Sequence, residues 1–146
     1  MRLWRISAHP GLAGIGGTFA NGRWHTAPRA VTYAAEHPAL AMVEVLARMR
    51  IQPDNIPRSL RLLAIDVADA GVSHEPELPA GWHANEPTTQ AVGNAWLSSG
   101  STLLMRVPSS VLPHAFNFLI NPAHASARKL VEVDLGPFWF DARLLR

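Results

Sequence analysis

The sequence predicts a single compact α+β domain with mixed β-sheets. Its 146 residues lie near the commonest domain size, and 48% apolar against 16% charged residues is the balance of a globular chain with a substantial core. Short runs typical of strands outnumber helical segments, and the two kinds do not alternate regularly, which favours α+β over a parallel α/β sheet. Residues 1–146 contain no internal repeat and no composition shift that would indicate a linker, so one domain is expected.

The first half of the chain predicts three strands and one helix. Residues 3–7 alternate as a strand does, whereas five glycines within residues 8–22 predict a long loop. Pro38 suits the first turn of a helix because its missing N–H needs no partner there, and Pro53 stops that helix. The expected elements are a strand over 3–7, a strand over 30–34, a helix over 38–50 and a buried strand over 60–67.

The second half begins with a turn-rich segment, residues 71–87, and ends in strands. Gly100 is placed to end a helix, because glycine readily adopts the left-handed conformation that follows the last helical turn. The expected elements are a helix over 88–98, strands over 102–107, 115–120 and 130–135, and a final edge strand over 138–142.

Composition excludes several classes of function. The net charge is +2 and the arginines are dispersed, so no basic block is expected to follow a nucleic-acid backbone. The absence of cysteine excludes disulfides and thiolate metal sites, and the seven histidines lack the spacing of a zinc site. No apolar run has the character of a signal peptide or a membrane span, so a soluble cytoplasmic protein without membrane contact is expected.

Glu44 is the strongest candidate for a functional carboxylate. On a helical wheel, apolar side chains cover most of the circumference of the expected helix, and Glu44 lies with Arg48 in one narrow polar wedge. Two interpretations remain open. The pair is either an exposed ion pair one helical turn apart, which contributes little to stability, or Glu44 is a carboxylate with a function.

Arg23 follows the glycine-rich segment and precedes Trp24. Its guanidinium offers a fixed fork of donors to phosphate or carboxylate, and flexible backbone beside it lets N–H groups approach an anion. An arginine that ends a surface loop is the alternative. The glycines do not match the dinucleotide fingerprint of a Rossmann fold, because Phe19 stands where the third glycine belongs.

Four further polar side chains occur in apolar surroundings. Tyr33 is the only tyrosine, and its strand position fits either core packing or contact with a ligand. Ser109 follows Pro108 at the end of a strand, where a hydroxyl often caps a turn. Asn117 and Asn121 are four residues apart, so in a strand they point to the same face. Buried amides on that face need partners, which a ligand or a neighbouring loop can supply.

These segments resemble the RES domain, the toxin half of the RES–Xre toxin–antitoxin systems. The family takes its name from an Arg, a Glu and a Ser, and those positions match Arg23, Glu44 and Ser109. The resemblance covers nearly the whole chain, and the ordered combination carries it. The matching segments are Leu3-Trp4-Arg5-Ile6, Gly22-Arg23-Trp24, Val31-Thr32-Tyr33-Ala34, Met42-Val43-Glu44-Val45-Leu46, Val107-Pro108-Ser109 and residues 117–122 with His124.

The resemblance implies the fold of the ADP-ribosyltransferase toxins and an enzyme that cleaves the nicotinamide–ribose bond of NAD+. It implies catalytic roles for Glu44 on the ribose, Arg23 on the pyrophosphate, and Ser109 on the nicotinamide ribose or amide. NAD+ is expected as the substrate, with no cofactor and no metal. His25 and His124 either line the pocket or are structural. The expected substrate-binding residues are Arg23, Tyr33 beside the nicotinamide, Trp24, Ser109, Asn117 and Asn121.

The resemblance leaves the acceptor of ADP-ribose open. Water would make a glycohydrolase, inorganic phosphate a phosphorylase, and a protein side chain an ADP-ribosyltransferase. A non-catalytic binder of a phosphorylated ligand is the alternative from another class. The family implies a partner, an Xre-type helix-turn-helix antitoxin, which would make the contacts to DNA. The apolar run 138–140 is either a contact surface, for the antitoxin or for a homodimer, or part of the core.

Overall fold

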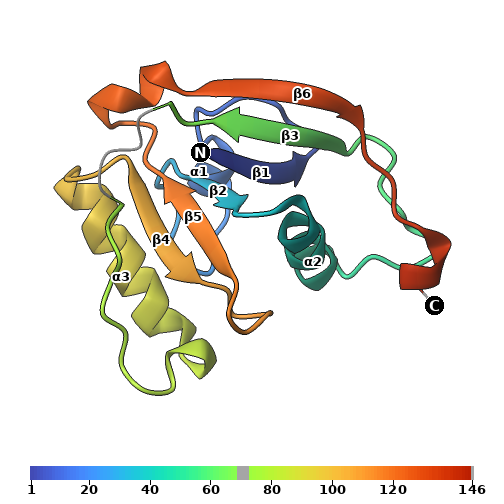
Figure 1. Cartoon of the computed structure of the whole chain (residues 1–146). Helices are drawn as coiled ribbons and strands as arrows, with labels where there is room; N and C mark the ends of the chain where they lie inside the picture. The colour runs from blue at the N-terminus through green and yellow to red at the C-terminus, as the bar shows by residue number, and fades with distance from the viewer. Residues whose placement is uncertain (69–72, 146) are drawn as a thin grey trace.

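The computed structural model describes residues 1–68 and 73–145 and contains one six-stranded sheet (Figure 1). The strands lie in the order β4-β5-β2-β1-β3-β6, and every neighbouring pair is antiparallel. The expected α+β class is confirmed, but the expected mixed sheets are replaced by one antiparallel sheet, because alternation in a sequence does not encode strand direction. The strands are β1 (Arg2–Ser7), β2 (Thr32–Ala35), β3 (Arg61–Asp66), β4 (Leu104–Pro108), β5 (Phe116–Ile120) and β6 (Val131–Pro137).

The helical elements are α1 (Gly16–Phe19), α2 (Pro38–Met49), α3 (Glu86–Ser99) and the 3₁₀ turns η1 (Trp82–Ala84), η2 (Ala125–Lys129) and η3 (Ala142–Leu144). Side chains just before α2 and α3 cap them. Nδ1 of His37 accepts a hydrogen bond from the amide of Ala39 at 3.0 Å, and Oδ1 of Asn85 accepts one from the amide of Thr88 at 3.2 Å. Each cap satisfies a donor that the first helical turn leaves without a partner.

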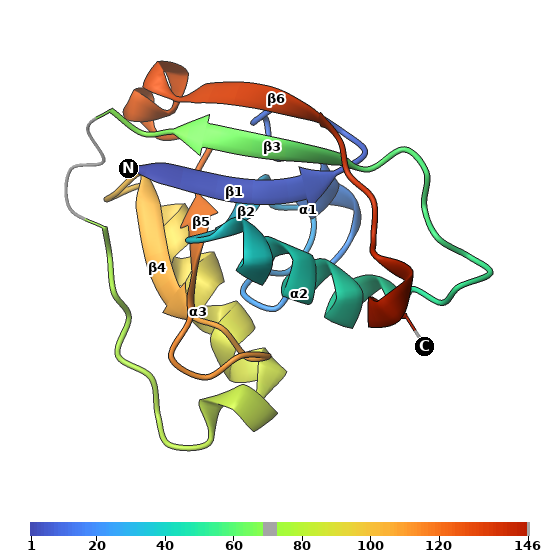
Figure 2. The same ribbon diagram turned by 45° about the vertical axis from the view of Figure 1, so that its right-hand side comes forward.

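Helices α2 and α3 pack against the same face of the sheet. In Figures 1 and 2, α3 lies beside β4 and β5, and α2 lies beside β1 and β2. Ala35 packs in the cluster under α2, and Tyr33 packs in the cluster under α3. Side chains two residues apart on a strand share a face, so both helices cover the same side of the sheet.

The opposite face of the sheet is also buried. Leu3, Ile65 and Phe118 form a second core layer there, and Leu12 of the β1–α1 loop and Ala127 of η2 pack against it. Burial on both faces fixes the register of the strands, because a shift by one residue would exchange the two sets of side chains. No helix in the described part of the chain is long and apolar enough to cross a membrane.

Two sequence predictions about local structure are wrong. The expected loop 8–22 contains α1, and the expected edge strand 138–142 is not a strand. The amide of Phe138 donates to the carbonyl of Leu60, after which the chain leaves the sheet so that Phe140 enters the core under α2. Phe138 and Phe140 pack edge to face, and within this run only Trp139 is largely exposed, at 77%. The expected turn-rich segment 71–87 begins outside the described residues.

Candidate active site

The sheet opens between β1 and β2, and this opening forms the candidate active site. The two strands pair at one position, Trp4 opposite Ala35, and then separate. A cavity of about 460 Å³ lies at the opening and is bounded by both strands, by α2, and by the first residue of α3. Four of the side chains that the sequence predicted for the site line this cavity together: Arg23, Tyr33, Glu44 and Asn117.

Glu44 is held by two donors from the β4–β5 hairpin. Its Oε1 accepts hydrogen bonds from Oγ of Ser109 at 2.6 Å and from Nδ2 of Asn117 at 2.7 Å. Within the described residues Oε2 accepts none, and Glu44 forms no ion pair with Arg48. The interpretation as an exposed ion pair is therefore wrong. One carboxylate oxygen is fixed, and the other is available to a ligand in the cavity.

Ser109 is buried, and its hydroxyl is fully engaged. It donates to Glu44 and accepts from the amides of Val111 at 3.1 Å and Leu112 at 3.0 Å. A hydroxyl has one proton to donate and two lone pairs, and all three are used here. Ser109 therefore caps the hairpin turn and orients the carboxylate at once, and it does not line the cavity.

Arg23 lines the cavity with its guanidinium turned toward η1. Its Nη2 donates to the carbonyl of His83 at 2.7 Å and to that of Trp82 at 3.1 Å. Its Nε is buried and has no hydrogen-bond partner in the part of the chain that the structure describes. Carbonyl groups hold the side chain in place without cancelling its charge, so Arg23 remains able to attract an anion.

Tyr33 is tied to the glycine-rich segment through His25. Its hydroxyl accepts from the amide of Trp24 at 3.1 Å and lies 2.7 Å from Nδ1 of His25, whose Nε2 lies 3.1 Å from the carbonyl of Gly17. Because a carbonyl only accepts, Nε2 carries a proton, and in the tautomer protonated at Nε2 alone Nδ1 accepts from the phenol O–H. Burial raises the pKa of the Tyr33 phenol well above its ordinary value. The phenol is thus a neutral wall of the cavity.

Three of the proposed binding residues do not line the cavity: Ser109, Trp24 and Asn121. Trp24 is buried in the core under α3, where a Cβ on Gly93 would overlap its carbonyl oxygen. Asn121 is also buried, and its Oδ1 accepts from the amide of Ala123. His124 caps η2 by accepting from the amide of Ser126. These side chains support the fold around the site.

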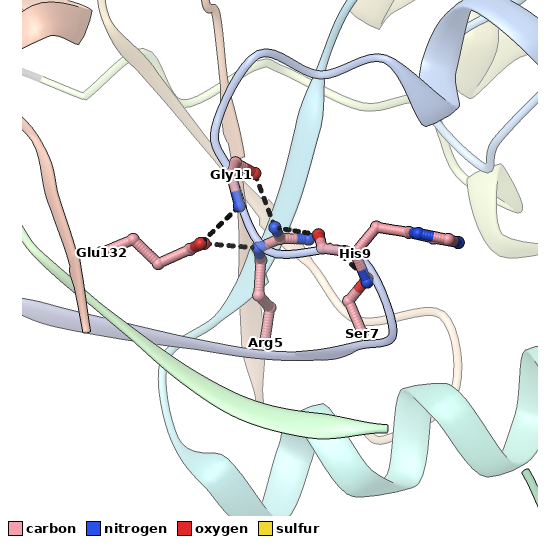
Figure 3. A network of polar contacts seen from close by, with 5 residues as sticks. All are labelled: Arg5, Ser7, His9, Gly11 and Glu132. Atoms are coloured by element: carbon pink, nitrogen blue, oxygen red, sulfur yellow. Dashed lines mark hydrogen bonds and ion pairs between the residues drawn. The ribbon is translucent and has the colours of Figure 1, made fainter. Parts of the chain in front are cut away.

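Several lining residues escaped the sequence prediction, and Arg5 is the best connected of them (Figure 3). Its Nε forms an ion pair with Glu132 at 2.9 Å, and its Nη2 donates to the carbonyls of His9 at 2.9 Å and Gly11 at 2.6 Å. Glu132 in turn accepts from the amide of Gly11 at 2.6 Å. The pair anchors the β1–α1 loop, and only contacts distant in sequence could have revealed it.

A second cavity, of about 640 Å³, lies under the β1–α1 loop and adjoins the first. His25 lines this one rather than the first. Within the described residues, no group of three or more histidine, aspartate or glutamate side chains is placed to hold a metal ion.

The fold and the cavity define a small α+β domain in which helix α2 presents a hydrogen-bonded carboxylate at the opening of an antiparallel sheet. The family model for the RES domain matches residues 2–141, and the chain belongs to this family. "Toxin Res" of Pseudomonas putida is 42% identical over 99% of both chains. "Prs ADP-ribosylating toxin" of Sphingobium sp. is 32% identical and covers 99% of this chain and 96% of its own length.

A solved structure has the same fold. It is a chain in the crystal structure of the M. tuberculosis MbcT–MbcA toxin–antitoxin complex, with a TM-score of 0.67 and 20% identity. The match covers 92% of this chain and 83% of that chain. The resemblance drawn from the sequence is confirmed for the family and for the fold.

Proposed function

We propose that this protein is the toxin of a type II toxin–antitoxin system and that it consumes NAD+ by cleaving the nicotinamide–ribose bond. Membership of the RES family and the similarity to proteins named as toxins support the first part. The second part depends on the site. Loss of NAD+ would arrest growth.

The observation that carries the proposal is the hydrogen bonding of Glu44, which fixes one of its carboxylate oxygens. Cleavage at the ribose passes through an oxocarbenium-like state, as glycoside cleavage does. A carboxylate fixed through one oxygen presents its other oxygen to the positive charge that develops at C1′ or to the ribose hydroxyls. Because the two donors are already in place, the carboxylate needs no reorganisation when the bond breaks.

The neighbouring side chains fit the rest of the substrate. Arg23 attracts the phosphate next to the nicotinamide ribose, and Tyr33 offers a neutral aromatic wall to the nicotinamide. We assign Ser109 and Asn117 as positioning residues that orient Glu44. Trp24 and Asn121 hold the surrounding structure without touching substrate. NAD+ acts here as a substrate, and the proposed chemistry needs no metal.

The acceptor of ADP-ribose distinguishes three reactions. Water makes a glycohydrolase and inorganic phosphate a phosphorylase. The name of the Sphingobium relative favours a second candidate, transfer of ADP-ribose to a protein. Mass spectrometry of the products, with and without phosphate and with a candidate protein acceptor, separates them.

The proposed partner is an antitoxin, of the Xre type that the family implies. The similarity to a toxin from a toxin–antitoxin complex supports a partner of this kind. We propose that the antitoxin blocks the cavity near Arg23 and the glycine-rich segment, since this is the simplest way to stop the reaction.

Replacement of Glu44 by Gln tests the proposal. Glu44→Gln keeps the shape and removes the charge, so nicotinamide release from NAD+ should fall by a factor of about 10²–10³ or more, with little change in the melting temperature. Glu77→Gln, an exposed residue outside both cavities, is the matched control. The assay is run with a chelator, because the proposed chemistry needs no metal ion and release should persist without one. Near wild-type release by Glu44→Gln would contradict the assignment, and thermal stabilisation by NAD+ without release would indicate a binding module.

A further inference from the structure

The two cavities share part of their lining, and we describe them as two lobes of one hollow. They share the lining residues Arg5, Ile6, Asn21, Gly22, Tyr33 and Arg48. The first lobe contains Glu44 and Arg23, and the second is lined by the β1–α1 loop and α1. A ligand with one end at Glu44 and a second bulky end would therefore pass the shared residues on its way into the second lobe.

The two arginines at the middle of the hollow differ in their charge balance. Arg5 is neutralised by Glu132, and its Nη2 donates to two loop carbonyls. Arg48 lies one helical turn after Glu44 on α2, and within the described residues its side chain has no hydrogen bond and no ion pair. Of these two arginines, Arg48 is thus the one whose charge no carboxylate of the described residues neutralises, and it is available to pair with an anion.

Phe19 stands at the rim of the second lobe. It lines that cavity, yet 82% of its surface is exposed. Ordinary packing does not explain this placement, because the residue contributes little buried area. A flat aromatic side chain that is open to solvent beside a cavity is the kind of platform on which nucleobases stack.

We propose that the second lobe takes the distal nucleoside of a dinucleotide, with Arg48 on the diphosphate and Phe19 stacked on the distal base. The proposal rests on the proposed function, because it takes Glu44 as the end where the nicotinamide ribose lies. It assigns different residues to the two halves of the substrate. Arg23 binds the nicotinamide half, whereas Arg48 and Phe19 bind the half that does not react.

Kinetics with substrates of different length test the proposal on the full chain. Arg48→Gln should raise KM for NAD+ about tenfold, the low end for a charge-assisted contact at an exposed site, and leave kcat within about twofold. It should leave kcat/KM for nicotinamide riboside, which lacks phosphates, unchanged. Phe19→Ala should raise KM for NAD+ about tenfold. It should not change KM for nicotinamide mononucleotide, which lacks the distal nucleoside.

Matched variants separate recognition from general effects. Arg58→Gln removes an exposed arginine outside both lobes and should change nothing. Phe19→Trp keeps an aromatic face and should restore the KM for NAD+ that Phe19→Ala loses. An equal loss for NAD+ and nicotinamide riboside in Arg48→Gln would overturn the assignment of Arg48, and wild-type KM in Phe19→Ala would overturn that of Phe19.

Direct binding distinguishes a failure of this inference from a failure of the proposed function. Calorimetry with ADP-ribose needs no cleavage. If the wild-type protein binds ADP-ribose about tenfold more tightly than either variant, the second lobe is supported even when no nicotinamide is released. If nicotinamide is released but both variants bind ADP-ribose as the wild type does, the inference is wrong and the proposed function stands. A wild-type protein that does not bind ADP-ribose would overturn the inference.

Discussion

Glu44 depends on two side chains that are far from it in sequence. Ser109 and Asn117 are 65 and 73 positions away, yet both donate to the same carboxylate oxygen. Ser109 also accepts from two amides of the hairpin turn. A single hydroxyl therefore couples the shape of the β4–β5 hairpin to the direction of the carboxylate.

Removal of that hydroxyl should destabilise the protein. Ser109→Ala leaves the amides of Val111 and Leu112 without an acceptor, so we expect the free energy of unfolding to fall by about 1–3 kcal/mol. Urea denaturation measures it. Ser98→Ala, on the exposed surface of α3, should stay within about 0.5 kcal/mol of the wild type. Equal stability of both variants would show that the turn does not need the Ser109 hydroxyl.

Tyr33 gives a prediction about alkaline pH. Burial raises the pKa of its phenol in the folded protein, whereas the unfolded chain titrates near the ordinary value of about 10. Above that pH the unfolded state binds fewer protons than the folded state, so stability falls as pH rises, by up to about 1.4 kcal/mol per pH unit. Below that pH this group does not affect stability.

Because Tyr33 is the only tyrosine, difference absorbance of tyrosinate reports this one group. The folded protein should show no phenol ionisation near pH 10, and the signal should appear only together with alkaline unfolding measured by circular dichroism. A reversible titration near that pH in the folded protein would contradict the buried environment. Tyr33→Phe provides the baseline.

At the scale of elements, the sequence predicted what is decided within a few residues. Pro38 and the apolar periodicity predicted α2 to within one residue of its end at Met49, and Gly100 ends α3 as expected. That the chain leaves the sheet at Phe138 was not predictable, because an aromatic run suits a strand as well as an irregular segment packed into the core. The burial of Phe140 under α2 selects the irregular conformation over the strand.

The site was predictable as a set of residue types and not as a geometry. Arg23, Tyr33, Glu44 and Asn117 line one cavity as the resemblance suggested, but Ser109 acts behind the carboxylate instead of in the cavity. Local patterns do not show which polar group donates to which. Arg48 had a local signal, its position one turn after Glu44, whereas the ion pair of Arg5 with Glu132 had none.

Loss of the Arg5–Glu132 pair should loosen the β1–α1 loop. Both side chains are largely buried, so Glu132→Ala leaves an uncompensated charge and should cost about 3 kcal/mol. Hydrogen exchange in residues 8–15 should accelerate, because the amide of Gly11 loses its acceptor. The double variant Arg5→Met with Glu132→Leu should recover part of the stability. Unchanged exchange in Glu132→Ala would show that the pair does not hold the loop.

For the whole molecule, the small net charge of +2 and the dispersed arginines predict weak contact with DNA. A mobility-shift assay on the isolated protein should show no operator binding at physiological salt, whereas the complex with its antitoxin should bind. Light scattering on the same samples gives the oligomeric state. Tight operator binding by the isolated protein would contradict the assignment of DNA contact to the antitoxin. A strictly monomeric protein would rule out the homodimer as the use of the apolar run 138–140.

The ion pair between Arg5 and Glu132 also sets an order of events during synthesis. The two residues are 127 positions apart, so β6, which carries Glu132, is synthesised well after the β1–α1 loop. Until Glu132 has emerged from the ribosome, the loop that lines the second cavity lacks its anchor. The half of the site that we assign to the distal nucleoside is therefore completed only after β6 has emerged and paired with β3.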